Sequence, residues 1–124
     1  MVFMLSPGLA ASAILLNSAV AKFSMSILFR VPRKDDPKSK VYQNASRAQL
    51  NEAEYAPLFL AALLFLHAKG IDAPWASTLA VFGQIAYFWG RLATGKMLPF
   101  APLGSTPRYI ALFLLAHAVY STTA

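Results

Sequence analysis

The feature that most constrains this chain is its division into long apolar blocks separated by short charged segments. Residues 3–29 carry a single charge, Lys22, whereas most charged residues of the chain lie between Arg30 and Glu54. A helix rises about 1.5 Å per residue, so a block of that length can cross a hydrocarbon core about 30 Å thick. The pattern predicts a membrane protein.

Composition supports this reading and excludes other classes. The chain has 124 residues, of which 57% are hydrophobic and 13% charged, whereas a soluble domain has about 45–50% apolar and about 25% charged residues. Its formal net charge is +6, but no basic face interleaved with aromatic residues accompanies it, so we expect no nucleic-acid binding. It has no cysteine and two distant histidines, so we expect no metal site.

Turn and charge signals divide the chain into four helices. Lys69 and Gly70 are a stop signal, Pro74 suits the first turn of a new helix, and the segment from Arg30 to Ser46 has the charges and prolines of a loop. A cleaved signal peptide is the alternative for the first block, but no basic segment precedes it, so we expect a retained helix. The predicted helices cover residues 3–29, 46–68, 74–92 and 107–122, the last being short for a membrane span.

Short connections favour one all-α domain, an integral membrane four-helix up-and-down bundle. A second basic loop is predicted from Arg91 to Arg108, which has three positive charges, no acidic residue and three prolines. Both basic loops would then lie on the same side of the membrane. The excess of Lys and Arg in cytoplasmic loops places these loops in the cytoplasm and both termini on the opposite side.

The start of the second helix carries more polar groups than a lipid-facing helix tolerates. At about 100° per residue, one stripe contains a cation, an amide, a carboxylate and a phenol, while Gln49 and Glu52 point to other faces. The stripe comprises Arg47, Asn51, Glu54 and Tyr55. Polar groups in a membrane helix generally face the bundle interior or a cavity. The stripe fits a small zwitterion with several carboxylates, such as glutathione. The alternative is an Arg47–Glu54 pair or a polar seam between helices.

The same residues carry a resemblance. The pattern Arg47-Ala48-x-x-Asn51-x-x-Glu54-x-x-Pro57 resembles the signature of the membrane-associated proteins in eicosanoid and glutathione metabolism, the MAPEG family. Residues 47–61 are especially similar to the leukotriene-forming synthase branch, and the microsomal glutathione transferase branch is the other close one. The resemblance implies a homotrimer in the endoplasmic reticulum or another internal membrane, with glutathione held between neighbouring subunits at the cytoplasmic end.

The resemblance also implies an activity and a binding site. Glutathione would be the co-substrate of a membrane-bound transferase or peroxidase whose partner substrate is a hydrophobic electrophile, either a lipid or a xenobiotic. The residues expected to bind glutathione are Arg47, Gln49, Asn51, Glu54 and Tyr55. Tyr87 and Arg91 share a face of the third helix, with Gln84 one turn earlier, and would line the same cleft. The alternative for Tyr87 is a place in the aromatic belt at the membrane interface.

An arginine near the cytoplasmic end would stabilise the glutathione thiolate. Arg108, in Thr-Pro-Arg-Tyr before the fourth apolar block, resembles the arginine of prostaglandin-forming relatives and ranks first, with Arg30 second. For each, the alternative is an anchor that reaches the membrane surface. Residues 91–96 lack the tyrosines of the leukotriene-forming branch, so a non-catalytic lipid-presenting protein is the alternative function. A small transporter or channel subunit is a third reading.

Overall fold

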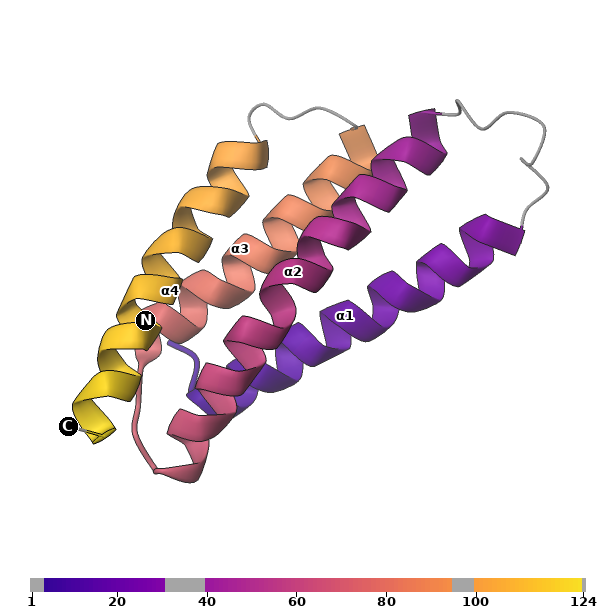
Figure 1. Ribbon diagram of the computed structural model, residues 1–124. Coiled ribbons are helices and arrows are strands. Elements are labelled where there is room, and N and C mark those ends of the chain that lie inside the picture. The colour runs from indigo at the N-terminus through magenta and orange to yellow at the C-terminus, as the bar shows by residue number, and fades with distance from the viewer. Residues whose placement is uncertain (1–3, 31–39, 95–99, 124) are drawn as a thin grey trace.

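Four helices make up the part of the chain that the computed structural model describes, which is residues 4–30, 40–94 and 100–123. They are α1 (Pro7–Arg30), α2 (Lys40–Ala68), α3 (Pro74–Thr94) and α4 (Phe100–Thr123). The helices run alternately up and down, so α1 and α3 end, and α2 and α4 begin, at one end of the bundle (Figure 1). The all-α four-helix fold predicted from the sequence is confirmed for these residues. We call the shared end the basic end, because Arg30 and Arg91 lie near it.

The helix boundaries differ from the prediction at two places. α2 begins at Lys40 rather than at residue 46. No Pro or Gly lies between Pro37 and Pro57, so nothing interrupts the helix, and Asn44 and Ser46 are interior residues instead of caps. The prediction of a loop that extends to Ser46 was wrong.

α4 begins at Phe100 rather than at residue 107, so the predicted short fourth helix was also wrong. Pro102 lies in the first turn, where a backbone N–H has no partner within the helix and its absence costs little. Pro107 lies inside the helix, which continues to Thr123 over 24 residues. At about 1.5 Å per residue, α4 is about 36 Å long and matches α1. α1 and α3 differ from prediction only at their ends, since they cover Pro7–Arg30 and Pro74–Thr94.

The predicted stop of α2 is confirmed by its backbone hydrogen bonds. Gly70 has a φ of 70°, its N–H donates to the carbonyl of His67 at 3.1 Å, and the N–H of Ile71 donates to the carbonyl of Leu66 at 3.0 Å. This pair of bonds is a Schellman motif, which ends a helix on a left-handed residue. The left-handed backbone at Gly70 reverses the chain direction, and α3 begins four residues later at Pro74.

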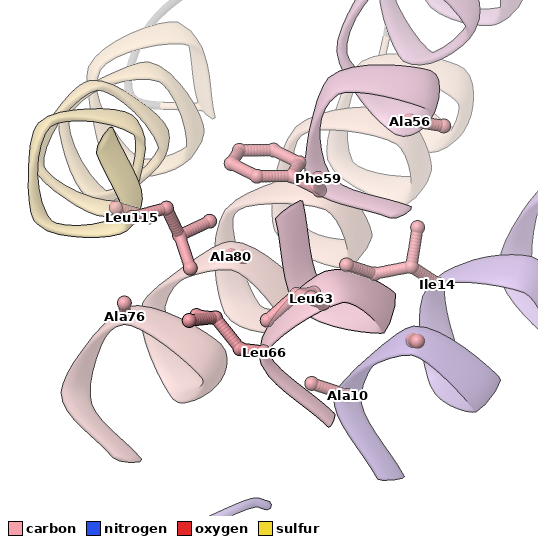
Figure 2. Close-up of a cluster of buried hydrophobic side chains, with 11 residues drawn as sticks. Ala10, Ile14, Ala56, Phe59, Leu63, Leu66, Ala76, Ala80 and Leu115 are labelled. Atoms are coloured by element: carbon pink, nitrogen blue, oxygen red, sulfur yellow. The ribbon is translucent and has the colours of Figure 1, made fainter. Parts of the chain in front are cut away.

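α2 and α3 lie at the centre of the bundle. Each of them packs against the three other helices, whereas the described parts of α1 and α4 do not touch. The main core lies in the half of the bundle near the α2–α3 turn, where side chains of all four helices converge (Figure 2). The fully buried members include Ile14, Phe59, Leu63, Leu66 and Leu115. The buried charged and amide side chains lie mainly in the other half, toward the basic end.

The outer surface is largely apolar. Phe113 is 79% exposed and Phe23 is 68% exposed, and leucines of α1, α2 and α4 are exposed as well. Such a surface suits lipid or a neighbouring subunit better than water. Among the described residues, the stretch Pro7–Met25 is long and apolar enough to count as a candidate membrane span on length and composition. Four membrane spans therefore stay a prediction.

Candidate functional site

The side chain of Arg108 is the centre of the buried polar half. α4 projects it between α2 and α3, where it is fully buried. Its Nη1 donates to Oδ1 of Asn51 on α2 at 2.5 Å and to Oε1 of Gln84 on α3 at 3.2 Å. Its Nη2 donates to Oγ of Ser105, one turn earlier on α4, at 3.3 Å. One guanidinium therefore connects three helices.

Two tyrosine rings complete the surroundings of this cation. The guanidinium carbon of Arg108 lies 4.0 Å from the ring centre of Tyr55 and 4.3 Å from that of Tyr87. Each such contact is worth about 2 kcal/mol when water is excluded. We call this set the Arg108 cage. It consists of Asn51, Tyr55, Gln84, Tyr87 and Ser105 around Arg108.

The Arg108 cage is neutral apart from the arginine itself. Its hydrogen-bond acceptors are amide and hydroxyl oxygens, and within the described ranges no carboxylate lies within ion-pair distance of the guanidinium. The Nε atom of Arg108 is buried and has no hydrogen-bond partner. The exposed carboxylate of Glu54 acts on Arg108 only at longer range. A buried cation without a counter-ion in direct contact is costly, and an anion that approaches it is strongly stabilised. The cage is therefore suited to hold negative charge.

Close packing of α3 against α4 puts Arg108 in this position. A Cβ atom on Gly83 would lie 2.4 Å from Cγ of Arg108 and 2.8 Å from the carbonyl oxygen of Gly104. A Cβ atom on Gly104 would lie 2.4 Å from Cβ of Tyr87. The two glycines thus allow the backbones to approach at the level of the cage.

Arg91 extends the cage toward the basic end. It is 5% exposed, and its Nη1 donates to the phenol oxygen of Tyr87 at 2.8 Å. Its guanidinium carbon lies 5.5 Å from the Tyr87 ring centre. The shared face of Tyr87 and Arg91 is as predicted, and Tyr87 lies between two cations.

The polar stripe at the start of α2 is divided between two environments. Asn51 and Tyr55 turn toward Arg108, whereas Arg47 and Glu54 are exposed in the single chain, and Gln49 is half-buried. Around the axis of α2, the stripe covers an arc of about 100°, so only one of its edges can face the bundle interior. Asn51 and Tyr55 lie on the inner edge, and Arg47 and Glu54 lie on the outer edge. Arg30 ends α1, and its side chain lies outside the described residues.

Glu52 is a buried group whose burial the sequence did not predict. It was expected to point away from the polar stripe, and it does so, but into the contact of α2 with α1, where it is 1% exposed. Ser18 of α1 donates to its Oε1, and Gln84 donates through Nε2 to its backbone carbonyl at 3.3 Å. Gln84 therefore joins α2 to Arg108 through both ends of its amide. Nearby, Trp89 donates to Asn17 at 2.7 Å, a further hydrogen bond between helices.

A signal for two of these residues is present in the sequence. Gln84 lies three residues before Tyr87, and Ser105 lies three residues before Arg108, so each shares a helix face with a predicted site residue. Ser18 has no comparable signal, because a lone serine on an apolar helix satisfies its own hydrogen bonds with the backbone in most settings. Among the described residues, no three His, Asp or Glu side chains group as metal ligands.

The sequence profile of the MAPEG family matches residues 2–119, nearly the whole chain. No curated protein and no solved structure matches the chain.

Proposed function

The chain belongs to the MAPEG family, whose members are membrane-associated and include glutathione transferases and synthases, and from the Arg108 cage we propose that it is a membrane-bound glutathione transferase or peroxidase. Membership supports a role in glutathione or eicosanoid metabolism. The leukotriene-forming branch, suggested by residues 47–61, stays a prediction.

The observation that carries the proposal is a fully buried arginine held only by neutral groups. A free thiol has a pKa of about 8.5, and a nearby cation lowers it and raises the fraction of nucleophilic thiolate at neutral pH. Donors that are already oriented need no reorganisation when charge develops on sulfur. Arg108 meets these conditions because Asn51, Gln84 and Ser105 fix its guanidinium.

The exposed edge of the polar stripe supplies groups for the rest of the tripeptide. Arg47 offers paired N–H donors for a carboxylate, and Glu54 offers an acceptor for the ammonium group. Both side chains are exposed in the single chain. Gln49, Tyr87 and Arg91 are the further proposed contacts, and Arg30 is the second candidate for thiolate stabilisation.

The thiol must reach a guanidinium that the single chain encloses. Asn51, Tyr55 and Ser105 are the half-buried members of the Arg108 cage. Of these, Tyr55 lies against Tyr109, which is 52% exposed, with ring centres 6.2 Å apart. We propose that glutathione enters beside these two rings, in a crevice between subunits of a homotrimer. The thiolate then forms a bond to an electrophilic carbon of a lipid or xenobiotic, and the electron pair of the broken bond leaves on the departing group.

The membrane supplies the second substrate in this proposal. A hydrophobic electrophile dissolves in the bilayer and meets the apolar outer faces of the helices. The basic end would face the cytoplasm, where glutathione is abundant, and the termini would lie on the other side of the endoplasmic reticulum or another internal membrane.

One observation favours the alternative of a non-catalytic MAPEG-like protein that binds a lipid and presents it to a partner. Arg108 has no exposed surface in the single chain, and an arginine that joins three helices stabilises a bundle without any ligand. Under this alternative, the protein would not conjugate glutathione even if it binds it.

The deciding experiment compares glutathione binding with turnover in the detergent-purified protein. We expect the wild type to bind glutathione and conjugate it to a generic electrophile. Arg47→Ala and Glu54→Ala should each weaken binding at least about tenfold, the typical cost of losing a charged hydrogen bond. Since both side chains are exposed, unfolding midpoints should not change, and Asp72→Asn in the α2–α3 turn is the matched surface control. Unchanged binding in both variants would refute the site, and binding without turnover would favour lipid presentation.

A further inference from the structure

A cavity of about 220 Å³ lies between α1 and α2, on the side of α2 that faces away from the Arg108 cage. One part of its wall is polar, with Ser18, Lys22 and Glu52, and the other part is apolar. The apolar wall is formed by Ala53, Ala56, Pro57 and Leu60.

The carboxyl group of Glu52 indicates a ligand site because one of its two oxygens has no hydrogen-bond partner. Oε1 accepts the hydrogen bond of Ser18, whereas Oε2 is buried and unpartnered. A buried carboxyl oxygen without a donor is costly, so a group that donates hydrogen bonds to it is strongly favoured. Lys22 lines the same cavity but is exposed, and within the described residues it does not reach Glu52 at ion-pair distance. The cavity therefore offers an acceptor and, separately, a cation.

The lining of the cavity changes from charged to apolar along the axis of the bundle. Lys22 and Glu52 lie toward the basic end, and Leu60 lies two turns farther along α2 from Glu52. Beyond the cavity the same faces continue with exposed leucines, since Leu15 is 59% exposed and Leu64 is 52% exposed. Leu15 precedes Lys22 by seven residues and Leu64 follows Leu60 by four, so each stays on the same helix face. A ligand here would have its charged head toward the basic end and its apolar part toward the middle of the bundle.

We propose that this cavity binds a phospholipid whose headgroup carries a primary ammonium. The ammonium donates to Oε2 of Glu52, the phosphate accepts from Lys22, and one acyl chain lies along Leu60, Leu64 and Leu15. Lys22 is eight residues from the end of α1, or about 12 Å along the helix, a depth from which a lysine reaches the headgroup region. A choline headgroup satisfies Glu52 poorly, because its quaternary ammonium has no N–H to donate.

The test uses native mass spectrometry of the full chain in detergent, after delipidation and addition of defined lipids. We expect the wild type to retain phosphatidylethanolamine at least about tenfold better than phosphatidylcholine of the same chains. Glu52→Gln should abolish this preference. Lys22→Met should weaken retention of both lipids, because both carry the phosphate. Asp72→Asn is the control and should behave as the wild type.

Four results would overturn the proposal. They are equal retention of the two lipids by the wild type, a preference that persists in Glu52→Gln, retention that Lys22→Met does not change, and displacement of the lipid by soluble glycerophosphoethanolamine. The last would assign the site to a free phosphodiester rather than to a membrane lipid. If Glu52→Gln does not fold, lipid retention by Lys22→Met is the deciding measurement. The side chain of Lys22 is exposed, so its loss should leave the fold intact. If a neighbouring subunit fills the cavity instead of a lipid, the wild type should retain the two lipids equally.

Discussion

Arg108 differs from an arginine at a protein surface in what surrounds its charge. Three oxygen acceptors fix the plane of the guanidinium, and two tyrosine faces lie at about van der Waals distance from it. A lysine in its place would lose the fork of donors that reaches Asn51, Gln84 and Ser105 together. The cation is thus oriented before any ligand arrives.

Gln84 tests whether this orientation matters. Gln84→Leu keeps the volume but removes the hydrogen bonds to Arg108 and to the carbonyl of Glu52, so we expect about 1–3 kcal/mol lower unfolding free energy and about tenfold slower conjugation. Gln84→Glu restores an acceptor for Arg108, so its stability should stay closer to that of the wild type. Its conjugation should nevertheless be slow, because a carboxylate beside Arg108 competes with the thiolate. Thermal unfolding and kcat measure the two effects, and a fast Gln84→Glu enzyme would contradict the electrostatic role.

The sequence predicted most members of the Arg108 cage but not Ser105. Asn51 and Tyr55 stand out because polar groups are rare in apolar helices, Arg108 was singled out by its resemblance, and the structure brings the three together. Glu52 was placed on another face, but the helical angle alone does not reveal that this face packs against α1. Whether a residue of the stripe is buried depends on the neighbouring helices, which is information that one helix does not contain.

At the level of helices, the central segments of the four helices were predictable and two starting points were not. Apolar length and the Gly70 stop located α1, α3 and the end of α2. The starts of α2 and α4 were misplaced because polar and proline-containing segments, 40–46 and 100–106, were read as loops. Both segments are compatible with helix: the first has no breaker, and the second has Pro102 in its opening turn.

The contact of α3 with α4 makes a prediction about glycine. Gly104→Ala would place a Cβ atom 2.4 Å from Cβ of Tyr87, so the helices must separate, at a cost of about 1–3 kcal/mol. Because Tyr87 and Arg108 lie on opposite helices of this contact, conjugation should slow as well. Ala93→Leu, which enlarges an exposed residue of α3, is the control and should change neither the unfolding midpoint nor the rate. A Gly104→Ala protein as stable and active as the wild type would show that the close approach is not needed.

On the scale of the whole molecule, the bundle has an apolar half and a polar half. The main core lies near the α2–α3 turn, and the buried polar groups lie toward the basic end. This asymmetry suits a protein that contacts lipid along its length and takes a water-soluble co-substrate at one end. The apolar outer surface leaves room for both lipid and the neighbouring subunits of the proposed trimer.

The orientation in the membrane gives a prediction that the absence of cysteine makes easy to test. Ala93→Cys lies on an exposed position near the basic end of α3, and Asp72→Cys lies in the turn at the other end. In sealed microsomes, we expect a membrane-impermeant maleimide to label Ala93→Cys at once. Asp72→Cys should be labelled only after detergent is added. The reverse pattern would contradict the predicted orientation, and immediate labelling of both positions would contradict a membrane-spanning arrangement.

The central claim is that Arg108 stabilises the thiolate of bound glutathione, and the ultraviolet absorbance of the thiolate tests it most directly. Glutathione added to the purified wild type at neutral pH should produce a thiolate band that disappears on acidification. Arg108→Met, which removes the charge while keeping a long side chain, should still bind glutathione but show no band at that pH, with conjugation about 100-fold slower. The same band in Arg108→Met and in the wild type would contradict the account.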